Sequence, residues 1–114
     1  MSQLKINLGE GSVAFQCSVE TATNIKQELA KLIVSLKAAS SNVGSGERPE
    51  RQDPLEYQYT GDVFLELFCN PNIWPSPFAA KVLITLRDDR IRITTEAELT
   101  QVIEDINQYL EQHS

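Results

Sequence analysis

Histidine is almost absent from this sequence of 114 residues, and its scarcity argues against several kinds of active site. The only histidine, His113, is the penultimate residue. Serine and cysteine nucleophiles need a neighbouring base, usually histidine, and zinc sites need histidine and cysteine in a cluster. The two cysteines, Cys17 and Cys69, are scattered relative to His113. We therefore expect no histidine-dependent catalysis and no metal site.

Motifs that hold phosphate or calcium are also missing. The sequence contains no GxxxxGK[ST] segment and no EF-hand spacing of acids and glycine. Gly9 and Gly11 precede a second strand pattern, whereas a dinucleotide-binding loop opens into a helix. The adjacent carboxylates suit other roles: Asp88–Asp89 suits a tight turn, and Glu104–Asp105 suits the solvated surface of a helix. We predict that the protein is not an enzyme and has no cofactor.

Long apolar runs are lacking as well. No run exceeds four residues, which excludes a transmembrane helix. Residues Met1–Lys5 alternate like a strand and lack the apolar segment of a signal peptide. We expect a cytoplasmic protein without membrane insertion.

Basic residues are few, ten against sixteen acidic ones, so the net charge is −6. This balance argues against nucleic acid as a partner, because phosphate binding depends on Lys and Arg. Lys81, Arg87, Arg90 and Arg92 are close in sequence, and the residues after them include five acids and no Lys or Arg. The acidic C-terminal segment is interpreted as the solvated face of a helix, or alternatively as a face that docks on a basic partner.

What is present indicates an α+β two-layer sandwich, in the order ββα-loop-βββα. Alternating apolar residues predict a hairpin over residues 4–17, turning at Gly9–Gly11, and a helix over 21–39 with Thr21 or Thr23 as its cap. Residues 55–70 form a strand that Gly61–Asp62 divides or distorts, and strands near 82–86 and 91–93 follow. A capping box of Thr95 and Glu98 begins the last helix. The result is one sheet of about five mainly antiparallel strands, with both helices on one face.

The domain is expected to span residues 1–114, with a connector inside it. Residues 40–54 hold one apolar residue with glycine, proline and charge, so no core can anchor them. We predict a mobile connector at 40–54.

Two apolar features stand out as candidate partner-binding sites. In the segment NPNIWPSPF (residues 70–78), three prolines restrict the backbone around Ile73, Trp74 and Phe78. This segment either folds Trp74 onto the core or presents a stiff apolar knuckle to a partner. Phe64 and Phe68 lie on the opposite strand face from their apolar neighbours, so we expect an exposed patch.

The cysteines leave a second hypothesis open. Cys17 and Cys69 lie on predicted strands among apolar neighbours, which favours small buried hydrophobes. Adjacent strands could also bring them together as a redox pair, or the chain could be a small-molecule-responsive domain.

Residues Asp62–Tyr109 are similar to small uncharacterised accessory proteins of cyanobacteria. The resemblance implies an assembly or regulatory role on a larger complex, such as a photosynthetic complex or a carboxysome. We therefore predict a non-enzymatic protein–protein interaction module: an adaptor, assembly factor or regulatory subunit. We also expect a homodimer, formed through the Phe64 and Phe68 face or by exchange of the C-terminal helix.

Overall fold

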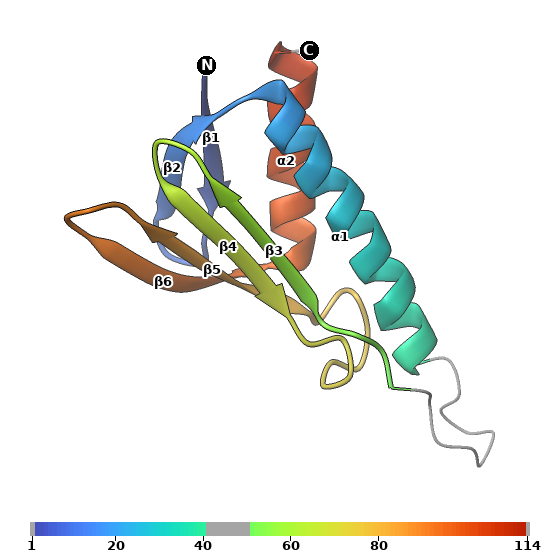
Figure 1. The fold of residues 1–114 in the computed structure, drawn as a ribbon. Coiled ribbons are helices and arrows are strands. Elements are labelled where there is room, and N and C mark those ends of the chain that lie inside the picture. Colours follow the sequence, from blue (N-terminus) through green and yellow to red (C-terminus); the bar gives the residue numbers. More distant parts are fainter. Residues whose placement is uncertain (1, 41–50, 114) are drawn as a thin grey trace.

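The computed structural model describes residues 2–40 and 51–113, and it shows an α+β fold (Figure 1). The strands are β1 (Ser2–Asn7), β2 (Ser12–Cys17), β3 (Leu55–Thr60), β4 (Phe64–Cys69), β5 (Lys81–Arg87) and β6 (Arg92–Glu98), and the helices are α1 (Val19–Ser40) and α2 (Leu99–His113). The fold class agrees with the prediction. The strand count does not, because the strands form a two-stranded sheet, β1-β2, and a four-stranded sheet, β3-β4-β5-β6.

The β1–β2 hairpin forms as the alternation predicts. Its antiparallel register runs from Ser2 opposite Cys17 to Asn7 opposite Ser12. Gly11 closes the turn with a φ of 84°, a left-handed conformation that glycine adopts without steric cost. The Leu8 N–H donates to the Gly11 carbonyl at 2.9 Å. The turn therefore depends on Gly11.

Helix α1 begins earlier than the sequence analysis placed it. Ser18 is the cap, since its hydroxyl oxygen accepts the Thr21 N–H at 3.1 Å and its carbonyl accepts the Ala22 N–H at 3.0 Å. Thr21 and Thr23 therefore lie inside the first turns, where the Thr23 hydroxyl donates back to the Val19 carbonyl. The predicted apolar stripe is buried: Ala22, Ile25, Leu29, Leu32 and Leu36.

The four-stranded sheet is an antiparallel meander. Gly61 and Asp62 form the turn between β3 and β4, so residues 55–70 make two paired strands rather than one. The Gly61 N–H donates to the Val63 carbonyl across this turn at 3.1 Å. A second tight turn joins β5 to β6, where Asp88 accepts the N–H groups of Arg90 and Ile91 through its carboxylate. Asp88 is thus a turn former, as the sequence indicated.

The proposed capping box at Thr95 and Glu98 is wrong. Both residues belong to β6, which pairs with β5 without interruption as far as Glu98 opposite Lys81. Threonine and glutamate fit a half-exposed strand as well as a cap, and the pairing with β5 decides between the two. Helix α2 begins at Leu99, whose N–H donates to the Ala80 carbonyl at 3.0 Å.

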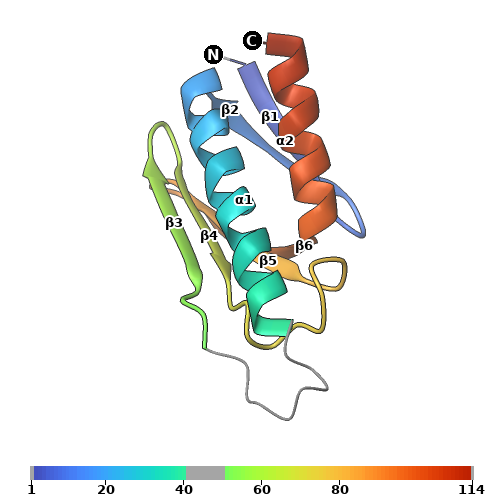
Figure 2. The same ribbon diagram turned by 90° about the vertical axis from the view of Figure 1, so that its right-hand side faces the viewer.

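The core lies between the four-stranded sheet, the hairpin and the helices. Figure 2 shows α1 and α2 running side by side, with the strands behind them. The inner strand residues and the helix stripes are almost fully buried, and the largest among them are Leu4, Ile6, Ile25, Leu29, Leu36, Leu65, Leu67, Ile84, Leu99 and Ile106. Both helices lie on the same side of the four-stranded sheet, where α1 packs against β3 and α2 packs mainly against α1 and β1.

A buried carboxylate fixes the hairpin to α2. Asp105 is only 5% exposed and accepts the Asn7 main-chain N–H at 2.7 Å. The other carboxylate oxygen of Asp105 accepts the Asn7 side-chain amide at 3.1 Å and the Gln101 side-chain amide at 2.9 Å. The prediction that Asp105 is solvated is wrong, because it lies on the same helix face as Val102 and Tyr109. The Tyr109 hydroxyl adds a second tie by donating to the Cys17 carbonyl.

The predicted connector at 40–54 falls mainly on residues 41–50, which lie outside the described residues. The part that is described is held to the segment after β4. The Gln52 N–H donates to the Asn72 side-chain oxygen, and the Asn72 amide donates to the Gln52 carbonyl, both at 2.8 Å.

Candidate functional site

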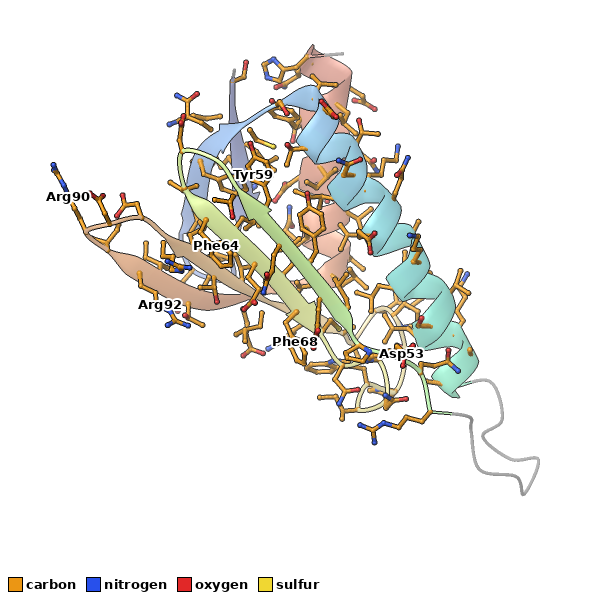
Figure 3. The ribbon with its side chains drawn as sticks, in the orientation of Figure 1. Asp53, Tyr59, Phe64, Phe68, Arg90 and Arg92 are labelled. Carbon is orange, nitrogen blue, oxygen red and sulfur yellow. The ribbon has the colours of Figure 1, made fainter. Side chains whose placement is uncertain are left out.

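The outer face of the four-stranded sheet carries the two predicted phenylalanines. Phe64 and Phe68 alternate along β4 with the buried Leu65 and Leu67, so they point away from the core. Figure 3 shows them on β4, with Arg92 on β6. Figures 1 and 2 show both helices on the other side of the sheet, and no described element covers this face.

The strand register orders this outer face into rows that cross β3, β4, β5 and β6. At one end Phe68 is opposite Leu83, and Glu56 and Glu96 flank this apolar pair. Leu83 is 37% exposed and Phe68 is half-buried. A sequence reading of β5 alone could have found Leu83, because it alternates with Val82 and Ile84.

The row at the other end combines an aromatic ring with a cation. Phe64 is opposite Arg87, and the Arg87 guanidinium carbon lies 4.3 Å from the centre of the Phe64 ring. A guanidinium at this distance makes a cation–π interaction. Arg92 continues the row on β6, opposite Arg87. This end of the face is positive.

The middle row is polar. The Gln58 amide donates to the Glu66 carboxylate at 2.7 Å, and Thr85 and Thr94 follow on β5 and β6. The outer face therefore has an apolar pair with acids at one end, a polar centre, and an arginine–aromatic pair at the other.

The segment of residues 70–78 separates its apolar side chains. Ile73 is 66% exposed and Phe78 is 84% exposed, whereas Trp74 is half-buried and packs against the core. Asn72 braces the segment, since its N–H and its amide both donate to the Asn70 side-chain oxygen. Each of the two alternatives for this segment therefore applies to different residues. Trp74 turns inward toward the core, whereas Ile73 and Phe78 are exposed to solvent.

Trp74 also meets one of the cysteines. Its indole N–H is buried close to the Cys69 sulfur and has no hydrogen-bond partner. Burial raises the pKa of the Cys69 thiol, and the indole N–H offsets part of that increase.

Cys17 lies in a separate setting, close to Tyr57 and Tyr109. Burial raises the pKa of the Cys17 thiol, and a main-chain hydrogen bond from Ala22 opposes the increase. Both cysteines are free and buried. Reactive cysteines have lowered pKa values and accessible sulfur atoms, so burial and raised pKa values favour the interpretation of both thiols as small buried hydrophobes, and the redox pair stays a hypothesis.

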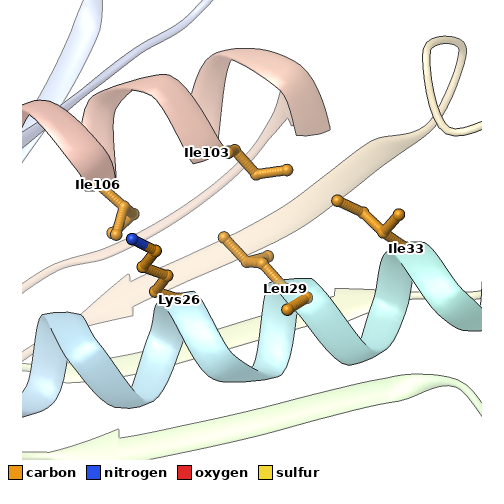
Figure 4. A pocket seen from close by; sticks show the side chains of 6 residues that line it. Lys26, Leu29, Ile33, Ile103 and Ile106 are labelled. Atoms are coloured by element: carbon orange, nitrogen blue, oxygen red, sulfur yellow. The ribbon is translucent and has the colours of Figure 1, made fainter.

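An apolar groove runs between the two helices. Leu29, Ile33, Ile103 and Ile106 form its walls, and Lys26 extends across it toward Ile106 (Figure 4). Its volume is about 110 Å³. Sites for drug-sized ligands measure about 300–1,000 Å³. This groove is therefore too small for such a ligand.

Among residues 2–40 and 51–113, no group of three or more His, Cys, Asp or Glu side chains is arranged to hold a metal ion. Within the same ranges, neither helix is long and apolar enough to span a membrane.

No family model, no curated protein and no solved structure matches this chain. The similarity of residues 62–109 to cyanobacterial accessory proteins stays a prediction. Function is therefore inferred from the surfaces of the chain itself, of which the outer face of the four-stranded sheet combines the most varied chemistry.

Proposed function

We propose that this chain is a non-enzymatic protein–protein interaction module that acts in the cytoplasm as an adaptor, assembly factor or regulatory subunit of a larger complex. The outer face of the four-stranded sheet is its partner-binding surface. The observation that carries this proposal is the uncovered row of Phe68 and Leu83, on the same face as the cation–π pair of Phe64 and Arg87 at its other end. Apolar side chains grouped on an uncovered sheet face are typical of interaction sites.

The charge pattern indicates what the partner presents. An apolar side chain suits the Phe68–Leu83 pair, and an acidic group suits the Arg87 and Arg92 end of the face. Nucleic acid fits poorly, because Glu56, Glu66 and Glu96 occupy the same face and repel phosphate. The partner is therefore a protein that presents an apolar contact and, at the other end of the contact area, a carboxylate.

The segment of residues 70–78 adds a second contact. Ile73 and Phe78 are exposed apolar side chains on a segment that prolines and Asn72 already hold in place. A preorganised segment loses little conformational entropy when a partner binds. Trp74 supports this segment from within and does not itself contact the partner.

The test removes the apolar pair from the outer face. In the variant Phe68→Thr/Leu83→Thr, the β-branched threonines keep the strand propensity while the apolar area is lost. Partner captured from an extract of the native host by immobilised wild-type protein is identified, purified and titrated against both forms. We expect the affinity to fall by at least tenfold, about 1.4 kcal/mol.

The matched control is Val34→Thr, which removes an apolar side chain that is 68% exposed on α1, away from this face. It should bind the partner as the wild type does. Equal binding by the wild type and the outer-face variant would refute the proposal.

A further inference from the structure

Strand β6 is a free edge of the four-stranded sheet. β5 pairs with one side of β6, and no described strand pairs with its other side. The β1–β2 hairpin packs nearby, where Phe15 lies close to Ile91 and Ile93 and the hairpin turn lies close to Glu98. Its residues are exposed except Thr95, which is half-buried, and Ala97, which is buried. The strand has no proline or bulge, two of the devices that prevent a sheet edge from pairing with another chain, and its charged residues are of both signs.

The main-chain groups that face this edge follow from the hydrogen bonds at the two ends of the β5–β6 ladder. At one end the Asp88 N–H donates to the Ile91 carbonyl, and at the other the Leu99 N–H donates to the Ala80 carbonyl. Bonded and non-bonded pairs alternate along an antiparallel ladder. The residues that bond to β5 are therefore odd-numbered, and the N–H and C=O groups of Arg92, Thr94 and Glu96 point to the free edge.

The side chains of these same residues are ordered so that the edge complements itself. In an antiparallel pair of two β6 strands with Thr94 on a two-fold axis, Arg92 of each copy lies opposite Glu96 of the other. Thr94 then lies opposite its own copy, a favourable cross-strand pair. Arg90 lies at the tip of the β5–β6 hairpin, next to the Arg92 end of this edge (Figure 3).

We propose that a second copy of this chain occupies the β6 edge, pairing antiparallel about Thr94 and joining two four-stranded sheets into one continuous sheet. A two-fold axis at Arg92 or Glu96 places like charges opposite each other, which is unfavourable. The other edge, β3, presents Glu56 with no cation on its own strand to complement it, and α1 packs against that strand. This pairing leaves Phe68 and Leu83 uncovered, so it does not depend on the proposed function.

Charge reversal tests the interface and its register together. Arg92→Glu and Glu96→Arg each place two like-charged pairs in the homodimer, and each should weaken self-association by about tenfold or more in sedimentation. An equimolar mixture of the two variants restores both opposite-charge pairs and should dimerise. The control Glu56→Arg makes the same charge change on β3 and should leave the dimer intact.

A cysteine at position 94 provides a second readout. In a bonded antiparallel pair the two Cα atoms are about 5.5 Å apart, a separation that a disulfide spans. Thr94→Cys should therefore form an intermolecular disulfide under mild oxidation, whereas Thr100→Cys, on an exposed position of α2, should not.

Three results overturn the proposal: a wild-type monomer at concentrations in the hundred-micromolar range, a dimer that Glu56→Arg breaks, or variants whose mixture stays monomeric. The variant Phe68→Thr/Leu83→Thr should still dimerise, which separates this test from that of the proposed function.

Discussion

Replacement of Trp74 by alanine tests whether Trp74 stabilises the fold while Ile73 and Phe78, in the same segment of residues 70–78, remain exposed to solvent. The Trp74 ring packs against the core, and its indole N–H is buried against Cys69. Emptying a fully buried aromatic site costs about 3–5 kcal/mol. Because Trp74 is only half-buried, we expect Trp74→Ala to lower the free energy of unfolding by about 2 kcal/mol, roughly half of that range.

The Trp74→Ala variant has no tryptophan fluorescence, so its free energy of unfolding is measured by chemical denaturation followed by far-UV circular dichroism. The controls are Ile73→Ala and Phe78→Ala, whose side chains are 66% and 84% exposed. Each should change the free energy of unfolding by about 0.5 kcal/mol or less. In the wild type, emission from Trp74, the only tryptophan, should shift to the red on unfolding. A Trp74→Ala variant as stable as the wild type, or a larger loss from Phe78→Ala, would show that the segment is misassigned.

Two further predictions concern stability. Asp105→Ala leaves the Asn7 N–H without its acceptor and should cost about 3 kcal/mol in denaturation, since hydrogen bonds to charged groups contribute about 1.5–3 kcal/mol each. Glu104→Ala beside it should have almost no effect, and equal losses would contradict the assigned role. Stability should also fall as the pH rises above about 8.5, where cysteines of the unfolded chain ionise. The buried thiols of Cys17 and Cys69 have raised pKa values and keep their protons, so the native state binds more protons there. Thermal melts of the wild type and of Cys17→Ala/Cys69→Ala test this, and an equal pH dependence of the two proteins would contradict it.

Local periodicity was sufficient for much of the fold. The alternation of Leu4 and Ile6 predicted the first hairpin, and the spacing of Ile25, Leu29 and Leu36 predicted the face of α1 that is buried. These signals depend only on neighbours along the chain, which is why they could be read without the structure.

Features that depend on distant pairing could not be predicted in this way. Thr95 and Glu98 fit a helix cap by their spacing, and only the pairing of β6 with β5 extends the strand through them. Asp105 looked solvated beside Glu104, yet its partner Asn7 lies 98 positions away in the sequence. The helical spacing of Val102, Asp105 and Tyr109 was the available signal.

For the candidate surface too, local alternation was readable from the sequence and the pairing between strands was not. Alternation along β4 correctly set Phe64 and Phe68 apart from the core face. It could not pair Phe64 with Arg87 or Phe68 with Leu83, because the register between β4 and β5 is set by the strands and turns together.

Site-specific photo-cross-linking tests the proposed partner surface most directly. A benzoylphenylalanine is placed at position 83 on the outer face and, in a separate protein, at position 34 on α1. After irradiation in an extract of the native host, the protein labelled at position 83 should form a discrete cross-linked species that competition with unlabelled wild type removes. The protein labelled at position 34 should form none. Cross-linking from position 34 alone, or none from position 83, would contradict the assignment of the outer face as the binding surface.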